Sequence, residues 1–467
     1  MLLVGARGVG VRVFGLLGNV VLARLLVPAE FGTVALALSL LTVASVLLDG
    51  GLGASLVRRA AEPTADELRN VLAVQLVGAA VLAGAVAGVG LWLGGAGEVA
   101  AVMMLALPLA AVRGPRMIVL QRRLAFGPIA AAEVGEVLAY YTWAVGAVAL
   151  GFGVWGLATA SIVKALVGTL TLARLGPWAP LRPAWSTERI RSLLRFGVRV
   201  QAVDLLRVLR DQGLTVGTFA IAGASTLGLW AIATRVLQIP LLLFESLWGV
   251  SFPAMSQLLA GGEDPRPLME KAVRVIAATT GLVATVLVCS TPALLPGVFG
   301  PSWADADLAV ALACIGLQVG SPISSVASGY LFASEGTGAV VRSSLAQAIV
   351  WPAVALPLLP LMGVTALGLG CVAAGIVEAL ILTSATRRLA GARLLRPALL
   401  PLAITVTVSS AGWLATAAMR PTLAAAVLGA LLGAAAYLVV LATVQRTLLL
   451  AIVDLVRRAL TKATRTA

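Results

Sequence analysis

The sequence contains no histidine, and only three of its 467 residues are cysteine. Without histidine the chain can form neither a Ser–His–Asp triad nor an HExxH zinc site, so hydrolases of those two kinds are excluded. Cys289, Cys314 and Cys371 lie in separate apolar stretches, a spacing that favours neither a disulfide nor a metal site. A GxxxxGK[ST] phosphate loop is also missing, which excludes ATP hydrolysis by this chain. We therefore expect no metal and no cofactor.

Charged residues are scarce as well. They make up 12% of the chain, whereas hydrophobic residues make up 60%. Soluble proteins are about 25% charged and about 45–50% apolar. The apolar runs are near 20 residues long, the length of a membrane-spanning helix, and not the roughly 10 residues of a barrel strand. The composition therefore predicts an all-α integral membrane protein.

Fourteen apolar stretches are candidates for membrane spans. They cover roughly residues 3–25, 31–53, 70–93, 99–120, 127–150, 154–174, 191–217, 226–256, 272–295, 306–332, 340–360, 363–386, 397–418 and 422–444. The apolar N-terminus contains arginines and is longer than a signal-peptide core, so we interpret it as a retained first helix.

The net charge of +14 has two possible causes. It could indicate nucleic-acid binding, but the basic residues concentrate in the even-numbered short connections between spans, which is the positive-inside pattern. We therefore expect no nucleic-acid partner, and we expect both termini and the even-numbered connections in the cytoplasm. All the connections are short, so no external domain is expected.

A weak internal repeat suggests how the spans are grouped. Residues 31–37 resemble residues 227–233, and at the same offset of 196 residues Asp49 aligns with Glu245. Chance similarity between two helices rich in alanine, leucine and glycine is the alternative. A true repeat predicts two six-helix lobes inserted the same way up. The expected parts are an N-lobe at 1–180, a cytoplasmic linker at 181–190, a C-lobe at 191–390, spans thirteen and fourteen at 391–445, and a basic cytoplasmic tail at 446–467.

The seventh span is unusual because it carries five charged residues. They are Arg199, Asp204, Arg207, Arg210 and Asp211. At about 100° per residue they fall within an arc of about 140° on one face of a helix. Each charge at mid-membrane costs roughly 2.5–3.5 kcal/mol on insertion scales. We therefore expect this face to line a protein interior or a wet cavity, opposite the first span.

Other charged residues also fall inside predicted spans, where ionisable groups are functional candidates. They are Arg12, Asp49, Glu133, Glu136, Arg235, Glu245 and Glu378. Two alternatives stay open. Asp49 and Arg235 could extend to the membrane interface. Glu133 and Glu136 could pair with Arg113, Arg116 or Lys164 and hold helices together.

The surplus of arginine in span seven suits an anionic ligand, and a pyrophosphate group is the natural candidate. We predict that Arg12, Arg199, Arg207, Arg210 and Arg235 bind the diphosphate. Asp204, Asp211, Glu133 and Glu136 are predicted to form ion pairs in the cavity. Asp49, Glu245 and Glu378 are the candidates for coupling or gating.

Several motifs resemble bacterial polysaccharide exporters of the Wzx, or lipopolysaccharide-flippase, type. The matches are the stretch from Leu17 to Arg59, Leu120–Phe126, Gly151–Leu157, Leu193–Gly197 and Leu227–Ile239, followed by Phe252-Pro253-Ala254. The family shares a superfamily with MATE drug exporters and lipid II flippases. The resemblance implies an inner-membrane flippase for undecaprenyl-diphosphate-linked oligosaccharide. It also implies membrane lipids as surroundings and glycan polymerases or chain-length proteins as possible partners.

Two other functions remain possible on the sequence alone. A MATE-like ion-coupled antiporter would export small molecules, but cationic substrates favour acidic and aromatic cavities over basic ones. A membrane-embedded enzyme of glycan assembly usually carries its acidic residues on a large outer loop, which is absent here. The sequence thus predicts a transport protein and not an enzyme.

Overall fold

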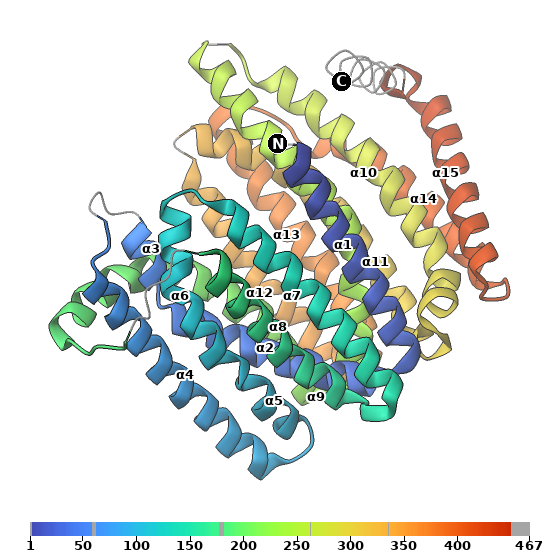
Figure 1. Ribbon diagram of the computed structural model, residues 1–467. Coiled ribbons are helices and arrows are strands. Elements are labelled where there is room, and N and C mark those ends of the chain that lie inside the picture. The colour runs from blue at the N-terminus through green and yellow to red at the C-terminus, as the bar shows by residue number, and fades with distance from the viewer. Residues whose placement is uncertain (1, 58–61, 177–181, 262, 335, 450–467) are drawn as a thin grey trace. The chain divides into compact units, whose positions relative to one another are not determined.

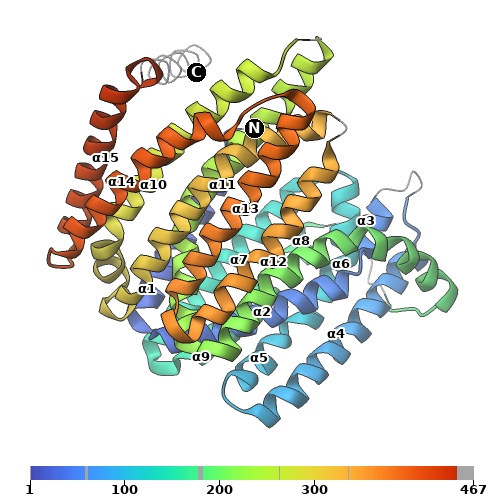
Figure 2. The same cartoon turned by 180° about the vertical axis from the view of Figure 1, so that it is seen from behind.

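The computed structural model describes residues 2–57, 62–176, 182–261, 263–334 and 336–449, and all secondary structure in these residues is helical. Figures 1 and 2 show the helices from opposite sides. Twelve of the described helices are long and apolar enough to cross a membrane. The prediction of an all-α, multi-pass membrane protein is therefore confirmed.

The helices follow one another with short connections. Their bounds are α1 Leu2–Leu25, α2 Pro28–Asp49, α3 Leu52–Val57, α4 Ala65–Leu93, α5 Ala96–Met104, α6 Ala106–Arg122, α7 Phe126–Ala147, α8 Val154–Leu175, α9 Thr187–Ala260, α10 Arg266–Leu294, α11 Asp307–Ala333, α12 Thr337–Met362, α13 Thr365–Ala390, α14 Leu395–Ala417 and α15 Leu423–Val444. Short π-helical turns follow α7 (Val148–Phe152) and α10 (Leu295–Phe299), and a 3-10 turn, Pro301–Ala306, precedes α11.

Glycines set several of the breaks between helices. Spans seven and eight were predicted at 191–217 and 226–256, and both lie on α9. The backbone leaves the helical region between them at Gly223 (φ 79°, ψ −179°), a conformation open to glycine and strained for other residues. The predicted span at 31–53 is interrupted by Gly50 and Gly51, both at positive φ, which separate α2 from α3. The predicted span at 99–120 comprises α5 and α6, divided at Leu105.

The chain forms two compact units, Met1–Gly228 and Leu229–Ala467, which are described separately below. The first arm of α9 packs with unit 1. The predicted lobe boundary at 181–190 and the internal repeat stay predictions. Most of the predicted basic tail at 446–467 lies outside the described residues.

Close contacts between small residues hold unit 1 together. Helices α4 and α5 form a hairpin in which Gly90 and Gly97 touch backbone to backbone, so neither position has room for a Cβ atom (Figure 1). Gly32 of α2 meets the backbone of α9 in the same way. The start of α4 is fixed by a capping box, in which Thr64 Oγ1 accepts from the Glu67 amide at 3.2 Å and the Glu67 carboxylate accepts from the Thr64 amide at 2.9 Å.

Unit 2 consists of two helix groups that share α11. Helices α11, α12 and α13 lie side by side in Figure 2, and Gly316 and Gly375 allow α11 and α13 to touch. Helices α14 and α15 pack on α10. The fully buried side chain of Cys289 on α10 fits among the glycines of these two helices, and Tyr437 on α15 donates its hydroxyl proton to the Ala278 carbonyl at 2.9 Å.

Candidate substrate-binding and coupling residues

The first arm of α9, up to Gly223, has a buried face and an exposed face. Counted from Arg199 at about 100° per residue, the buried residues Leu193, Leu214 and Thr218 project at about 120°, 60° and 100°. The exposed apolar residues Leu209 and Val216 project at about 280° and 260°. The five charged residues span about 0–140° on the same scale, so the ionic arc coincides with the buried face of the arm.

Asp211 and Ile221 depart from this division. Asp211 is exposed although it projects at about 120°. Ile221, near the end of the arm, is 46% exposed although it projects at about 40°. It lies directly before the break at Gly223, where the regular helix ends. The apolar surface that remains on the opposite side, at Leu209 and Val216, is of the kind that contacts lipid.

The neighbours of this arm in unit 1 include α2, α3, α4 and α6. Gly197 on α9 meets Gly51, just after α2, at backbone contact distance, and Gln201 donates from Nε2 to the Val46 carbonyl at 3.2 Å. At the start of α9, Arg189 forms an ion pair with Asp66 of α4 at 3.0 Å. These contacts explain why one face of the arm is buried.

Two of the five charged residues on the arm have described side chains. Arg210 Nε donates to Asp211 Oδ1 at 2.7 Å, and the two side chains are 26% and 44% exposed. An ion pair that stays accessible on an otherwise buried face fits a wet recess better than a dry core. The side chains of Arg12, Arg199, Asp204, Arg207 and Glu245 lie outside the described part of the structure, so their predicted places in a cavity stay predictions.

A second ion pair lies inside unit 1. Arg113 of α6 bonds to Glu136 of α7, and Gly168 of α8 leaves the space that these two side chains occupy. The Glu136 side chain is 11% exposed and that of Arg113 is 26% exposed. The pairing is one of those that the sequence left open, and it links three helices.

The remaining candidates are spread over both units. In unit 1, Asp49 is the last residue of α2 and is half-buried, while Glu133, one turn before Glu136, is exposed. In unit 2, Arg235 on the second arm of α9 is half-buried. Glu378 on α13 is also half-buried and accepts a hydrogen bond from Gln347 Nε2 on α12 at 3.1 Å. The structure thus places Glu378 in contact with the side-chain amide of a neighbouring helix.

Sequence reasoning did not predict a polar contact between α1 and α7. Asn19 on α1 donates from Nδ2 to the hydroxyl oxygen of Tyr141 on α7 at 2.8 Å, and it also donates to the Gly15 carbonyl at 2.8 Å. Gly15 and Gly18 leave room for the Tyr141 ring against α1. Two glycines one turn apart on α1, facing an aromatic residue on another span, were the signal for this contact.

Comparisons with known proteins agree with this architecture. The succinoglycan biosynthesis transport protein ExoT of Rhizobium meliloti (strain 1021) is 27% identical over 370 residues, which cover 71% of this chain and 72% of the relative. A structure of the lipid II flippase MurJ in an inward closed conformation has the same fold, with a TM-score of 0.70 at 12% identity over 96% of this chain and 100% of that one.

A second solved structure shares the fold. An inward-facing MATE multidrug transporter of the MOP superfamily matches with a TM-score of 0.59 at 15% identity over 81% of this chain and 95% of that one. Residues 21–307, more than half of the sequence, match the family described as "Polysaccharide biosynthesis protein". With its all-helical, MurJ-like fold, the chain belongs to this family of membrane exporters for polysaccharide biosynthesis.

Proposed function

We propose that the protein flips an undecaprenyl-diphosphate-linked oligosaccharide from the cytoplasmic to the outer leaflet of the bacterial inner membrane. The family, the transport role in the name of the succinoglycan relative, and a fold like that of a lipid II flippase support the proposal. The oligosaccharide would be a unit of O-antigen, capsule or exopolysaccharide. A glycan polymerase or a chain-length protein would then act on the product.

The observation that carries the proposal is the position of the ionic arc on α9. At about 100° per residue, the arc of charged positions falls on the side of the helix on which Leu193, Leu214 and Thr218 are buried, and opposite the exposed apolar residues Leu209 and Val216. A basic face inside the protein can receive an anionic group without exposing arginine to lipid. Guanidinium groups bind phosphate oxygens in pairs, which suits a diphosphate.

In this mechanism the arginines and aspartates have different tasks. Arg12, Arg199, Arg207, Arg210 and Arg235 hold the diphosphate. Asp204 and Asp211 orient the arginines and limit their affinity, as the Arg210–Asp211 ion pair at 2.7 Å illustrates. Asp49, Glu245 and Glu378 are the carboxylates available for gating or for coupling to an ion gradient. Two lobes moving in alternating access would carry the headgroup across.

The test is glycan display in cells that produce single variants of the full-length protein. Arg207→Ala and Arg210→Ala are expected to abolish surface glycan while the amount of protein in the membrane stays normal. Arg191→Ala is the matched control, because Arg191 is exposed on the same arm and projects at about 280°, away from the ionic arc. Normal glycan display in both test variants would rule out the proposed role of the α9 arginines.

A MATE-like antiporter is the second candidate, and the position of Glu378 favours it. This carboxylate is half-buried in a predicted span and is held by Gln347, as a group that binds and releases a cation could be. If the protein is an antiporter, cells that produce it should export a cationic dye such as ethidium, and the Glu378→Gln variant should not export the dye. Efflux that depends on Glu378, together with normal surface glycan, would favour the antiporter over the flippase.

A further inference from the structure

Unit 2 contains a pocket between the beginning of α12 and the end of α13, far along the chain from the ionic arm of α9. Its volume is about 510 Å³. One water occupies about 30 Å³ in the liquid, so the pocket has room for a glycerophosphate group. The pocket is lined by Gly336, Gly338, Ala339, Arg342, Ile381, Ser384, Ala385, Arg388 and Leu389.

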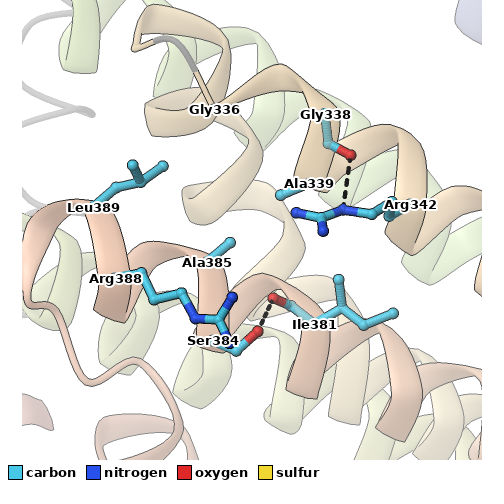
Figure 3. A pocket seen from close by; sticks show the side chains of 9 residues that line it. All are labelled: Gly336, Gly338, Ala339, Arg342, Ile381, Ser384, Ala385, Arg388 and Leu389. Atoms are coloured by element: carbon cyan, nitrogen blue, oxygen red, sulfur yellow. Dashed lines mark hydrogen bonds between the residues drawn. The ribbon is translucent and has the colours of Figure 1, made fainter.

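Two arginines from different helices give this pocket its chemistry. In Figure 3 the side chains of Arg342 and Arg388 extend into the pocket from its two sides. Arg342 donates from Nε to the Gly338 carbonyl, one turn earlier on α12, at 3.3 Å, so its two terminal nitrogens are not used in this bond. Among the described residues, neither arginine forms an ion pair with a carboxylate. Glu335, the nearest acidic residue in the sequence, lies outside the described residues.

The start of α12 adds to the positive potential. Gly338 and Ala339 lie in the first turn of this 26-residue helix, where backbone N–H groups and the helix dipole attract anions. Guanidinium groups on opposite sides of a pocket can bind different oxygens of one phosphate. Two arginines that form no ion pair with any described carboxylate, together with a helix N-terminus at the same cavity, therefore suit a phosphate group.

The surroundings of the pocket indicate that the phosphate belongs to a lipid. Arg342 and Arg388 lie near the ends of two candidate membrane spans, Thr337–Met362 and Thr365–Ala390. The ends of membrane spans are where lipid headgroups are expected. Next to the pocket, Val341, Leu345 and Ile349 form an exposed apolar stripe along α12, with exposed fractions of 57%, 48% and 66%. Residues at this spacing share one face of a helix, so the stripe offers a track for an acyl chain that starts at the pocket.

We propose that this pocket binds the phosphate of an anionic glycerophospholipid, such as phosphatidylglycerol, with Arg342 and Arg388 as the two cationic contacts. The lipid would come from the leaflet that the basic connections assign to the cytoplasm. A lipid held here would anchor the ends of α12 and α13 at the membrane surface. The site does not depend on the α9 arginines or on the identity of the transported molecule.

The experiment is native mass spectrometry of the purified full-length protein with phosphatidylglycerol, phosphatidylcholine or inorganic phosphate. We expect phosphatidylglycerol to bind at least tenfold more tightly than phosphatidylcholine, whose headgroup carries no net charge. The double variant Arg342→Ala/Arg388→Ala should weaken phosphatidylglycerol binding by about 10-fold or more, because two charge-assisted contacts are lost. Arg387→Ala is the matched control, since Arg387 is an exposed neighbour of Arg388 that does not line the pocket.

Two further measurements keep the test decisive. Arg342→Lys/Arg388→Lys preserves the charges and should retain most of the binding, and thermal unfolding without added lipid shows whether each variant is folded. Equal phosphatidylglycerol binding by the wild type, the double alanine variant and Arg387→Ala would overturn the proposal. Inorganic phosphate that binds as well as phosphatidylglycerol would show a site for a free anion and overturn the assignment to a lipid.

Discussion

The Arg113–Glu136 ion pair offers a test of how the interior of unit 1 is stabilised. Removing one partner of a buried pair leaves an uncompensated charge and costs about 3–5 kcal/mol, whereas replacing both partners with apolar residues is often close to neutral. The side chains here are 26% and 11% exposed, so the expected cost lies at the low end, about 3 kcal/mol. We therefore expect Glu136→Met and Arg113→Met each to destabilise the protein strongly.

The double variant Arg113→Met/Glu136→Met should be more stable than either single variant. For a cooperative unit of about 150–250 residues, a loss of about 3 kcal/mol lowers the Tm by roughly 6–12 °C. The assay is thermal unfolding of the purified protein in detergent, followed by tryptophan fluorescence. Arg189→Ala, which breaks an ion pair whose side chains are about half exposed, is the control and should cost at most about 1 kcal/mol.

Two outcomes would refute this reasoning. If Glu136→Met unfolds at the same temperature as the wild type, Arg113 is adequately solvated without its partner. If the double variant is less stable than both single variants, the pair contributes more than the apolar packing that replaces it. Either result would show that the penalty for an unpaired buried charge does not determine the stability of the contact between α6, α7 and α8.

Three further changes probe the helix contacts. Gly433→Leu should separate α15 from α10, because a Cβ atom at this position would lie 2.7 Å from Cys289 Sγ. The thiol of Cys289, which is buried in the wild type, should then react with a maleimide that does not label the wild type. Tyr141→Phe removes the hydroxyl that accepts from Asn19 and should cost about 1 kcal/mol in thermal unfolding. The side chain introduced by Gly32→Val should collide with the α9 backbone and abolish surface glycan while the amount of protein stays normal. Wild-type levels of surface glycan in this variant would show that α2 and α9 can move apart without loss of function.

The helical architecture follows from the sequence because its causes are local. Span length is set by the thickness of the bilayer, and the break inside α9 falls where an alanine- and glycine-rich segment separates two apolar runs. The division of the predicted span at 99–120 into α5 and α6 was missed, although Pro108 has no N–H to donate to the Met104 carbonyl and therefore favours a break at Leu105. The separation of α2 from α3 was missed although Gly50 and Gly51 stand in the sequence, because an apolar run continues on both sides of them.

The pairing of side chains could be predicted only as a set of possibilities. Glu133 and Glu136 are one turn apart on α7, and the sequence offers Arg113, Arg116 and Lys164 as partners for both. Which pair forms depends on the rotation of α6 and α8 against α7, and this rotation is set by contacts such as the one at Gly168. The pocket at Arg342 and Arg388 was likewise beyond sequence reasoning, because it depends on the approach of two helix ends.

The ion pairs Arg113–Glu136 and Arg210–Asp211 illustrate two different uses of charge inside a membrane protein. Arg113 and Glu136 neutralise each other, so they can hold helices but exert little attraction on a substrate. The first arm of α9 carries three arginines and two aspartates in its ionic arc, and the Arg210–Asp211 pair accounts for one of each. The remaining two arginines and one aspartate leave a surplus of one positive charge. A transporter must release what it binds. In the proposed mechanism, this small surplus would attract a diphosphate without the affinity that a fully unpaired arginine cluster would have.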